Sequence, residues 1–192
     1  MKNIFILLLF VCSFFGKAQS LEQLKLDAVQ LYDATYTMDI NYILSKTYPK
    51  LFDIISKEDM EREIDNAFQN EIMRIRLVFP KTTYTYSDIK TINGKKFCVV
   101  TYKNVFRMIY EEKLNKEMAD ITLKMLQESL TNKKITFENT RNSFYIEGND
   151  TLVAIADDST KNEWYFLNYD ASSRGLFTQL FDKDILFQLG LH

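Results

Sequence analysis

Histidine, the usual carrier of general-base and metal chemistry, is scarce in this chain. The only histidine is His192, the last residue, and chain ends normally fray, so we expect no organised base there. A serine or cysteine nucleophile would then lack its usual partner, and a histidine-based metal site cannot be assembled. The densest acidic stretches, at residues 157–158 and 182–184, lack the spacing of a calcium loop. The sequence therefore predicts no metal and no cofactor.

Aromatic residues are the most abundant side chains in this sequence that could line a binding site. The chain contains 11 Tyr, 15 Phe and 1 Trp. In the segment 95–110, Asn104 interrupts an apolar row, and a buried amide needs hydrogen bonds that either the protein or a ligand can supply. Ordinary core packing and a ligand pocket are both open interpretations. For the pocket, the expected lining is Tyr36, Tyr102, Asn104, Phe106 and Trp164.

The first eighteen residues have the pattern of a secretory signal. Lys2 supplies a positive charge, residues 4–15 are almost entirely apolar, and Gly16 and Ala18 are small residues where a signal peptidase reads them. A membrane anchor is the competing interpretation, but this run is shorter than the about 20 apolar residues that cross a bilayer. We expect cleavage after Ala18, export to the periplasm or the extracellular space, and no anchor on the mature chain.

Residues 19–192 have the length of one domain and contain no linker or repeat, which favours one continuous domain. Loss of Lys2 and Lys17 with the signal lowers the basic count from 24 to 22 against 26 acidic residues, a net charge of −4. This mild negative charge gives no reason to expect nucleic acid as a partner, because such binding requires a clustered basic face. Cys98 is the only cysteine left and cannot form an internal disulfide, so we expect a buried small hydrophobe.

Helical spacing dominates the first part of the domain. Apolar residues recur at steps of three and four over residues 20–36, which predicts a helix. A short second helix is expected at 39–45, and Pro49 suits the start of the next turn. Ser56 has the position of a cap for a third helix that reaches about residue 70.

Strand spacing follows from residue 71. Segments 84–92 and 95–110 flank Asn93-Gly94, a pair typical of a type I′ hairpin, so the pairing is antiparallel. The second segment would be about 50 Å long, and we expect it to bend sharply or to break at a bulge. The remaining elements are strands at 135–137, 142–147, 151–157 and 162–169, a second hairpin turn at 147–150, and helices at 174–181 and 183–189.

A helix over residues 114–130 has two apolar stripes. One contains Met118 and Met125, and the other contains Leu123 and Leu126. A surface helix needs only one such stripe, so this helix is either buried on two sides of its own domain or uses one stripe as a lid or against a partner. A homodimer through Leu123 and Leu126 is the expectation in the second case.

These elements predict an α+β domain in which N-terminal helices pack on a strongly curved antiparallel sheet, with an extra mid-chain helix. Segment 36–52 with Asp39 and Pro49, the strand at 92–100, and the late strand at 162–167 with its tryptophan carry a resemblance. The chain resembles the cone-shaped superfamily that contains nuclear transport factor two and ketosteroid isomerase. The resemblance implies an apolar cavity between helices and sheet.

Two functions of different classes follow from this layout. The first is an exported, non-enzymatic domain that binds a small apolar ligand or a protein partner. The alternative is an acid–base enzyme, similar to an isomerase or a dehydratase, with Asp39 as the base and a tyrosine as the acid. Fold alone does not supply a mechanism, so binding is the preferred hypothesis.

Overall fold

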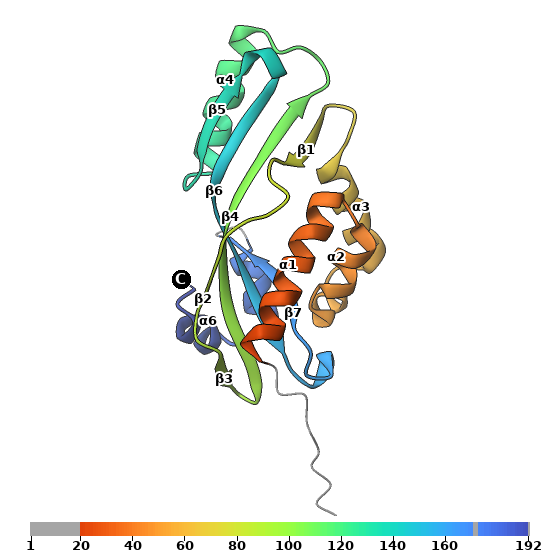
Figure 1. Ribbon diagram of the computed structural model, residues 1–192, viewed down its shortest axis with the longest axis vertical. Helices are drawn as coiled ribbons and strands as arrows, with labels where there is room; N and C mark the ends of the chain where they lie inside the picture. The colour runs from red at the N-terminus through yellow and green to blue at the C-terminus, as the bar shows by residue number, and fades with distance from the viewer. Residues whose placement is uncertain (1–19, 171–172, 192) are drawn as a thin grey trace, which may run out of the picture.

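The computed structural model describes residues 20–170 and 173–191 of the chain (Figure 1). The predicted signal at 1–18 lies outside these residues. N-terminal helices precede an antiparallel sheet that does not close into a barrel, and a further helix lies at mid-chain. The α+β class, with N-terminal helices ahead of the antiparallel sheet, is therefore confirmed.

The N-terminal helices begin and end at residues suited to those positions. The Ser20 hydroxyl accepts a hydrogen bond from the Gln23 amide at 3.1 Å, and Met38 ends the first helix in the left-handed region at φ 59°. Pro49 occupies the first turn of a short 3-10 helix, where its missing N–H costs nothing. These elements are α1 (Leu21–Thr37), α2 (Ile40–Lys46), η1 (Pro49–Asp53) and α3 (Lys57–Phe68).

Two long strands, β4 and β6, form the spine of the sheet. They pair from Lys96 opposite Ala156 to Ile109 opposite Ser143 in one continuous register. The shorter strands pair along their outer edges, and Asn93 and Gly94 form the expected tight turn with φ values of 50° and 77°. The strands are β1 (Met73–Leu77), β2 (Tyr84–Tyr86), β3 (Lys90–Ile92), β4 (Lys95–Tyr110), β5 (Lys134–Glu138), β6 (Ser143–Ala156) and β7 (Tyr165–Tyr169).

The expected break of β4 at a bulge and the expected turn at 147–150 were both wrong. Strand β4 stays paired with β6 from Lys96 to Ile109 without a bulge and twists with it (Figure 1). The expected turn at 147–150 lies in the middle of β6, where Gly148 pairs with Asn104. Gly148 leaves room for the segment that packs against it. A Cβ atom at this position would lie 2.5 Å from Cδ of Lys133 and 3.1 Å from the Asn132 carbonyl oxygen.

The Gly148→Ala variant should therefore be less stable than the wild type. The added methyl group collides with Lys133, and overpacking of this kind costs about 1–2 kcal/mol of the free energy of unfolding. Urea denaturation measures the difference. The matched control is Gly175→Ala in α5 (Arg174–Leu180), where the added Cβ has no described atom within 4 Å apart from its chain neighbours and its own helix backbone. An equal loss in both variants would contradict the explanation.

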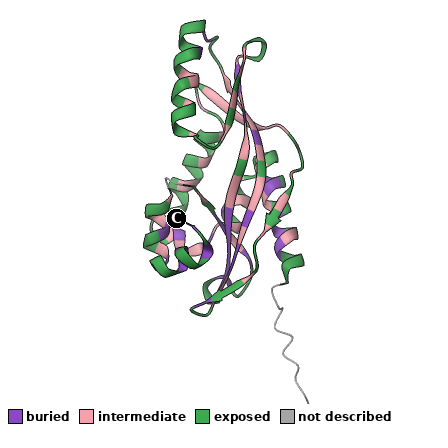
Figure 2. Ribbon diagram, turned by 90° about the vertical axis from the view of Figure 1, so that its left-hand side faces the viewer, coloured by how far each residue is buried: buried purple, intermediate pink, exposed green. Residues whose placement is uncertain are grey.

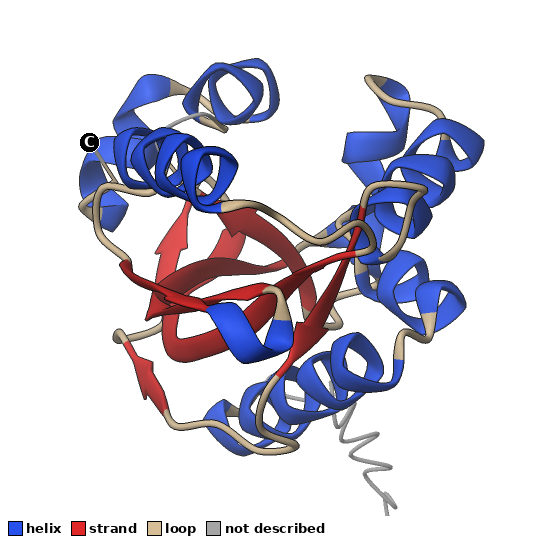
Figure 3. Ribbon diagram, turned by 90° about the horizontal axis from the view of Figure 1, so that it is seen from above, coloured by secondary structure: helices blue, strands red, loops and turns tan. Residues whose placement is uncertain are grey.

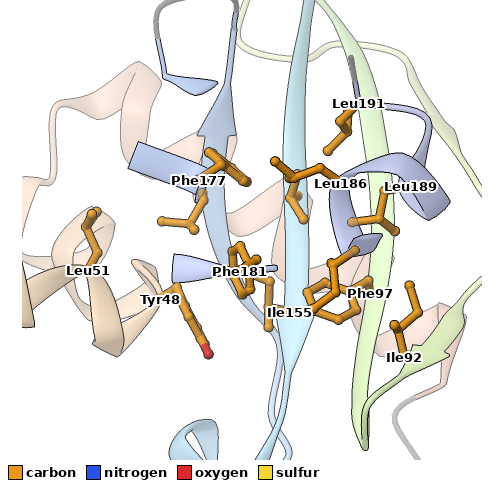
Figure 4. Packing of buried hydrophobic residues seen from close by; sticks show 13 residues of the cluster. Tyr48, Leu51, Ile92, Phe97, Ile155, Phe177, Phe181, Leu186, Leu189 and Leu191 are labelled. Carbon is orange, nitrogen blue, oxygen red and sulfur yellow. The ribbon is translucent and has the colours of Figure 1, made fainter. Parts of the chain in front are cut away.

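Helices lie on both sides of the sheet (Figure 3). In the half that contains β2, β3 and β7, which is the lower half in Figure 1, helices cover both faces. Leu24 and Ala28 of α1 pack on one face with Cys98, Val100 and Trp164. The opposite face is covered by α5 and α6 (Lys183–Leu189), whose side chains meet strand residues in the largest buried cluster (Figure 4). Buried residues concentrate in this lower half (Figure 2).

The upper half of the sheet has its own smaller core beneath α4 (Lys116–Ser129). Leu123 and Leu126 point toward this core and pack against it, so the structure uses the stripe predicted for a homodimer inside the domain. The exposed stripe is the other one: Met118, Ile121 and Met125 are 52, 54 and 63% exposed. Because α4 packs on one face of the sheet, the stripe with Leu123 and Leu126 is covered and the stripe with Met118 and Met125 is exposed.

Candidate functional site

A cavity of about 460 Å³ lies between the N-terminal helices and the sheet. This volume is within the range of pockets that hold small organic ligands. Helices α1, α2 and α3 form one wall, and strands β4, β6 and β7 form the other. The apolar and aromatic part of the lining includes Leu31, Tyr32, Ile43, Leu51, Met60, Ile64, Leu77, Tyr84, Tyr102, Leu152 and Phe166.

Three tyrosines from separate elements meet in the wall of the cavity. Tyr32 of α1 packs edge-on against Tyr84 of β2 and Tyr102 of β4, with ring centroids 6.5 and 6.0 Å apart. The Tyr32 hydroxyl donates to the Phe79 carbonyl at 3.0 Å. Burial raises the pKa of all three side chains above the ordinary tyrosine value, so their hydroxyl groups stay protonated and uncharged even in alkaline solution.

Helix α3 covers the cavity without a buried core of its own. Met60 and Ile64 face the cavity, yet no residue of α3 is fully buried. The helix is held at its ends: the Ser56 hydroxyl accepts from the Asp59 amide at 3.0 Å, and the Arg76 guanidinium donates to the Phe68 carbonyl at 2.6 Å. The apolar face of α3 therefore borders the cavity instead of filling it.

Charged residues lie at the border of the cavity and away from its apolar wall. Lys46 forms an ion pair with Asp27 at 3.4 Å and lies 5.8 Å from the centre of the Tyr165 ring. Glu63 and Asp170 belong to the lining, but both are exposed residues. An exposed carboxylate keeps its water, so neither has the desolvated surroundings that tune a catalytic acid or base.

Two of the five predicted pocket residues line the cavity. Tyr102 and Asn104 do so from β4. The other three do not: Tyr36 is 39% exposed on α1, Phe106 packs under α4, and Trp164 is completely buried in the core behind the wall. Phe106 and Trp164 fill space between layers of their own domain, and Tyr36 lies at the surface.

Asp39, the base of the alternative hypothesis, does not belong to the cavity lining. It is an exposed N-cap, and its carboxylate accepts a hydrogen bond from the Tyr42 amide at 3.0 Å. This position explains the residue by helix capping. Within residues 20–170 and 173–191, no group of three His, Cys, Asp or Glu side chains could hold a metal ion.

Sequence reasoning missed the helical side of the cavity. Tyr32 belongs to the apolar face of α1 that the sequence predicts, and Phe166 of β7 is two residues after Trp164. Their types gave no sign that they border a cavity, because a core residue and a lining residue are equally apolar. The spacing in α3 of Met60, Ile64 and Ala67 was the available signal, since it forms one face at steps of four and three.

Comparison of the chain with protein-family models, with curated proteins and with solved structures finds no match. In the part of the chain that the structure describes, no helix has both the length and the apolar character needed to cross a membrane.

Proposed function

We propose that this chain is exported and binds a small apolar ligand, without catalysis, in the cavity between α1, α2, α3 and the sheet. The observation that carries the proposal is the cavity itself, about 460 Å³ with a mainly aliphatic and aromatic lining. Burial of a ligand there would remove apolar surface from water, which stabilises a complex by about 25 cal/mol for each Å².

The arrangement around the cavity also supports the proposal. N-terminal helices cover one face of a twisted antiparallel sheet, which is the layout implied by the resemblance to the cone-shaped superfamily. Export rests on the sequence of residues 1–18. The acid–base alternative has less support, because Asp39 caps a helix and the carboxylates of the lining are exposed.

The test is binding of N-phenyl-1-naphthylamine, a neutral dye whose emission rises in apolar surroundings. Trp164 is the only tryptophan of the chain and packs in one cluster with Leu152 and Phe166, which line the cavity. We expect one dye molecule to bind with a micromolar Kd and to quench Trp164 emission by energy transfer. Titrating the dye into the mature chain while exciting the tryptophan measures both.

Absence of dye binding would reject the proposal. Binding that leaves Trp164 emission unchanged would also reject it, because the dye would then lie far from the cavity. The exposed stripe of Met118, Ile121 and Met125 is such a distant position, since α4 packs on the separate core of the upper half.

A further inference from the structure

One hydrogen-bond acceptor in the cavity wall has no donor among the residues that the structure describes. Oδ1 of Asn104 is buried and accepts no hydrogen bond from the described residues. Trp164 Nε1 and Tyr169 OH are also unpartnered there, but neither residue lines the cavity. A buried acceptor without a donor is costly, so a residue of this kind in a cavity wall points to a donor that comes from outside the chain.

The orientation of the Asn104 amide is set by its neighbours. Its Nδ2 donates to Oδ2 of Asp150, and the other oxygen of that carboxylate binds the Lys133 ammonium. Lys133 also donates to the Asn149 carbonyl at 3.1 Å, and its side chain is only 8% exposed. Because a carboxylate only accepts hydrogen bonds, the NH₂ group must face Asp150 and the oxygen must face away from it.

The surroundings of Asn104 in the wall are apolar or aromatic. Tyr102 lies two residues earlier on the same face of β4, and Leu77 pairs with Phe106, two residues later. A ligand at this end of the cavity therefore meets, beside aromatic and aliphatic side chains, an amide oxygen that can only accept a hydrogen bond and is held in one orientation. A hydroxyl group is the simplest donor that an apolar molecule can carry to such a position.

We propose that the cavity selects an apolar molecule that carries a hydroxyl group, and that Asn104 Oδ1 accepts the hydrogen bond from it. This inference rests on the proposed function, because it names the class of ligand for the same cavity. Asn104 is then a specificity-determining residue, while the apolar wall supplies most of the affinity.

Displacement of N-phenyl-1-naphthylamine by two matched compounds tests this proposal. Dodecan-1-ol and its methyl ether have the same chain and the same oxygen, but only the alcohol can donate. We expect the alcohol to displace the dye from the wild type at about tenfold lower concentration than the ether. In Asn104→Leu the two compounds should become equivalent.

The control variant is Ile43→Val, at another position in the cavity wall. The Ile43 side chain has no hydrogen-bonding atom, so this change should affect the alcohol and the ether alike and leave the alcohol-to-ether ratio unchanged. Equal displacement by both compounds on the wild type would overturn the role of Asn104 while the cavity proposal stands. Failure of the dye to bind would reject the cavity proposal itself. The wild-type comparison decides the matter even where Asn104→Leu does not fold.

Discussion

The Ala67→Trp variant is expected to bind N-phenyl-1-naphthylamine at least about tenfold more weakly than the wild type, a loss of about 1.4 kcal/mol or more. Ala67 lies on the cavity side of α3 and is exposed, so a large ring at this position can enter the cavity without replacing a packed core residue. The indole would occupy volume that the dye needs. Direct excitation of the dye measures its affinity without interference from the added tryptophan.

The matched control places the same ring on the other side of the helix. Asp65 is an exposed residue of α3 outside the cavity lining, so Asp65→Trp should bind the dye like the wild type. Thermal unfolding of both variants should match the wild type closely. Equal affinity of Ala67→Trp and Asp65→Trp for the dye would show that binding does not use this cavity.

The largest expected effect on stability comes from Asp157, which is only 4% exposed. Its carboxylate accepts hydrogen bonds from the Tyr48 hydroxyl at 2.7 Å and the Ser159 amide at 2.9 Å, and lies 3.6 Å from the Lys95 ammonium. The Asp157→Ala variant leaves the buried Tyr48 hydroxyl without its partner, so we expect a loss of about 3 kcal/mol in the free energy of unfolding. Asp158→Ala, at the exposed neighbour, should change it by less than about 0.5 kcal/mol.

This difference should depend on pH with a defined sign. Burial opposes ionisation of Asp157, but the hydrogen bonds from Ser159 and Tyr48 and the charge of Lys95 together outweigh it and lower the pKa. The carboxylate therefore contributes its full stability above the unfolded pKa of about 4 and loses it as the pH falls through the lower folded value. Urea denaturation from pH 7 to pH 3 should show the gap to Asp157→Ala narrowing in acid, and a widening gap would contradict this assignment.

Local sequence signals were sufficient to predict most of the fold. The apolar spacing of α1, the Ser56 cap and the Asn93-Gly94 turn each act within a few residues, and the structure confirms all three. The failure at Gly148 has a long-range cause. Its glycine is required by Lys133, which reaches it from the segment before β5, and no local pattern distinguishes that need from a turn.

The site was less predictable because lining and core residues share one chemistry. Alternation along β4 correctly grouped Tyr102 and Asn104 with Phe106 on one face. The covering element then changes along the strand, so that Tyr102 faces the cavity while Phe106 lies under α4. This boundary depends on where separate helices end in space, and neither composition nor spacing in a single sequence contains that information.

The uninterrupted pairing of β4 with β6 also restricts how the chain can change during evolution. Inserting or deleting one residue inside either strand would turn every following side chain to the opposite face, exposing Val100 or Phe144 and burying charges. Homologous chains with this architecture should therefore differ in length at the connections, such as the residues between α4 and β5, and keep the lengths of these two strands unchanged.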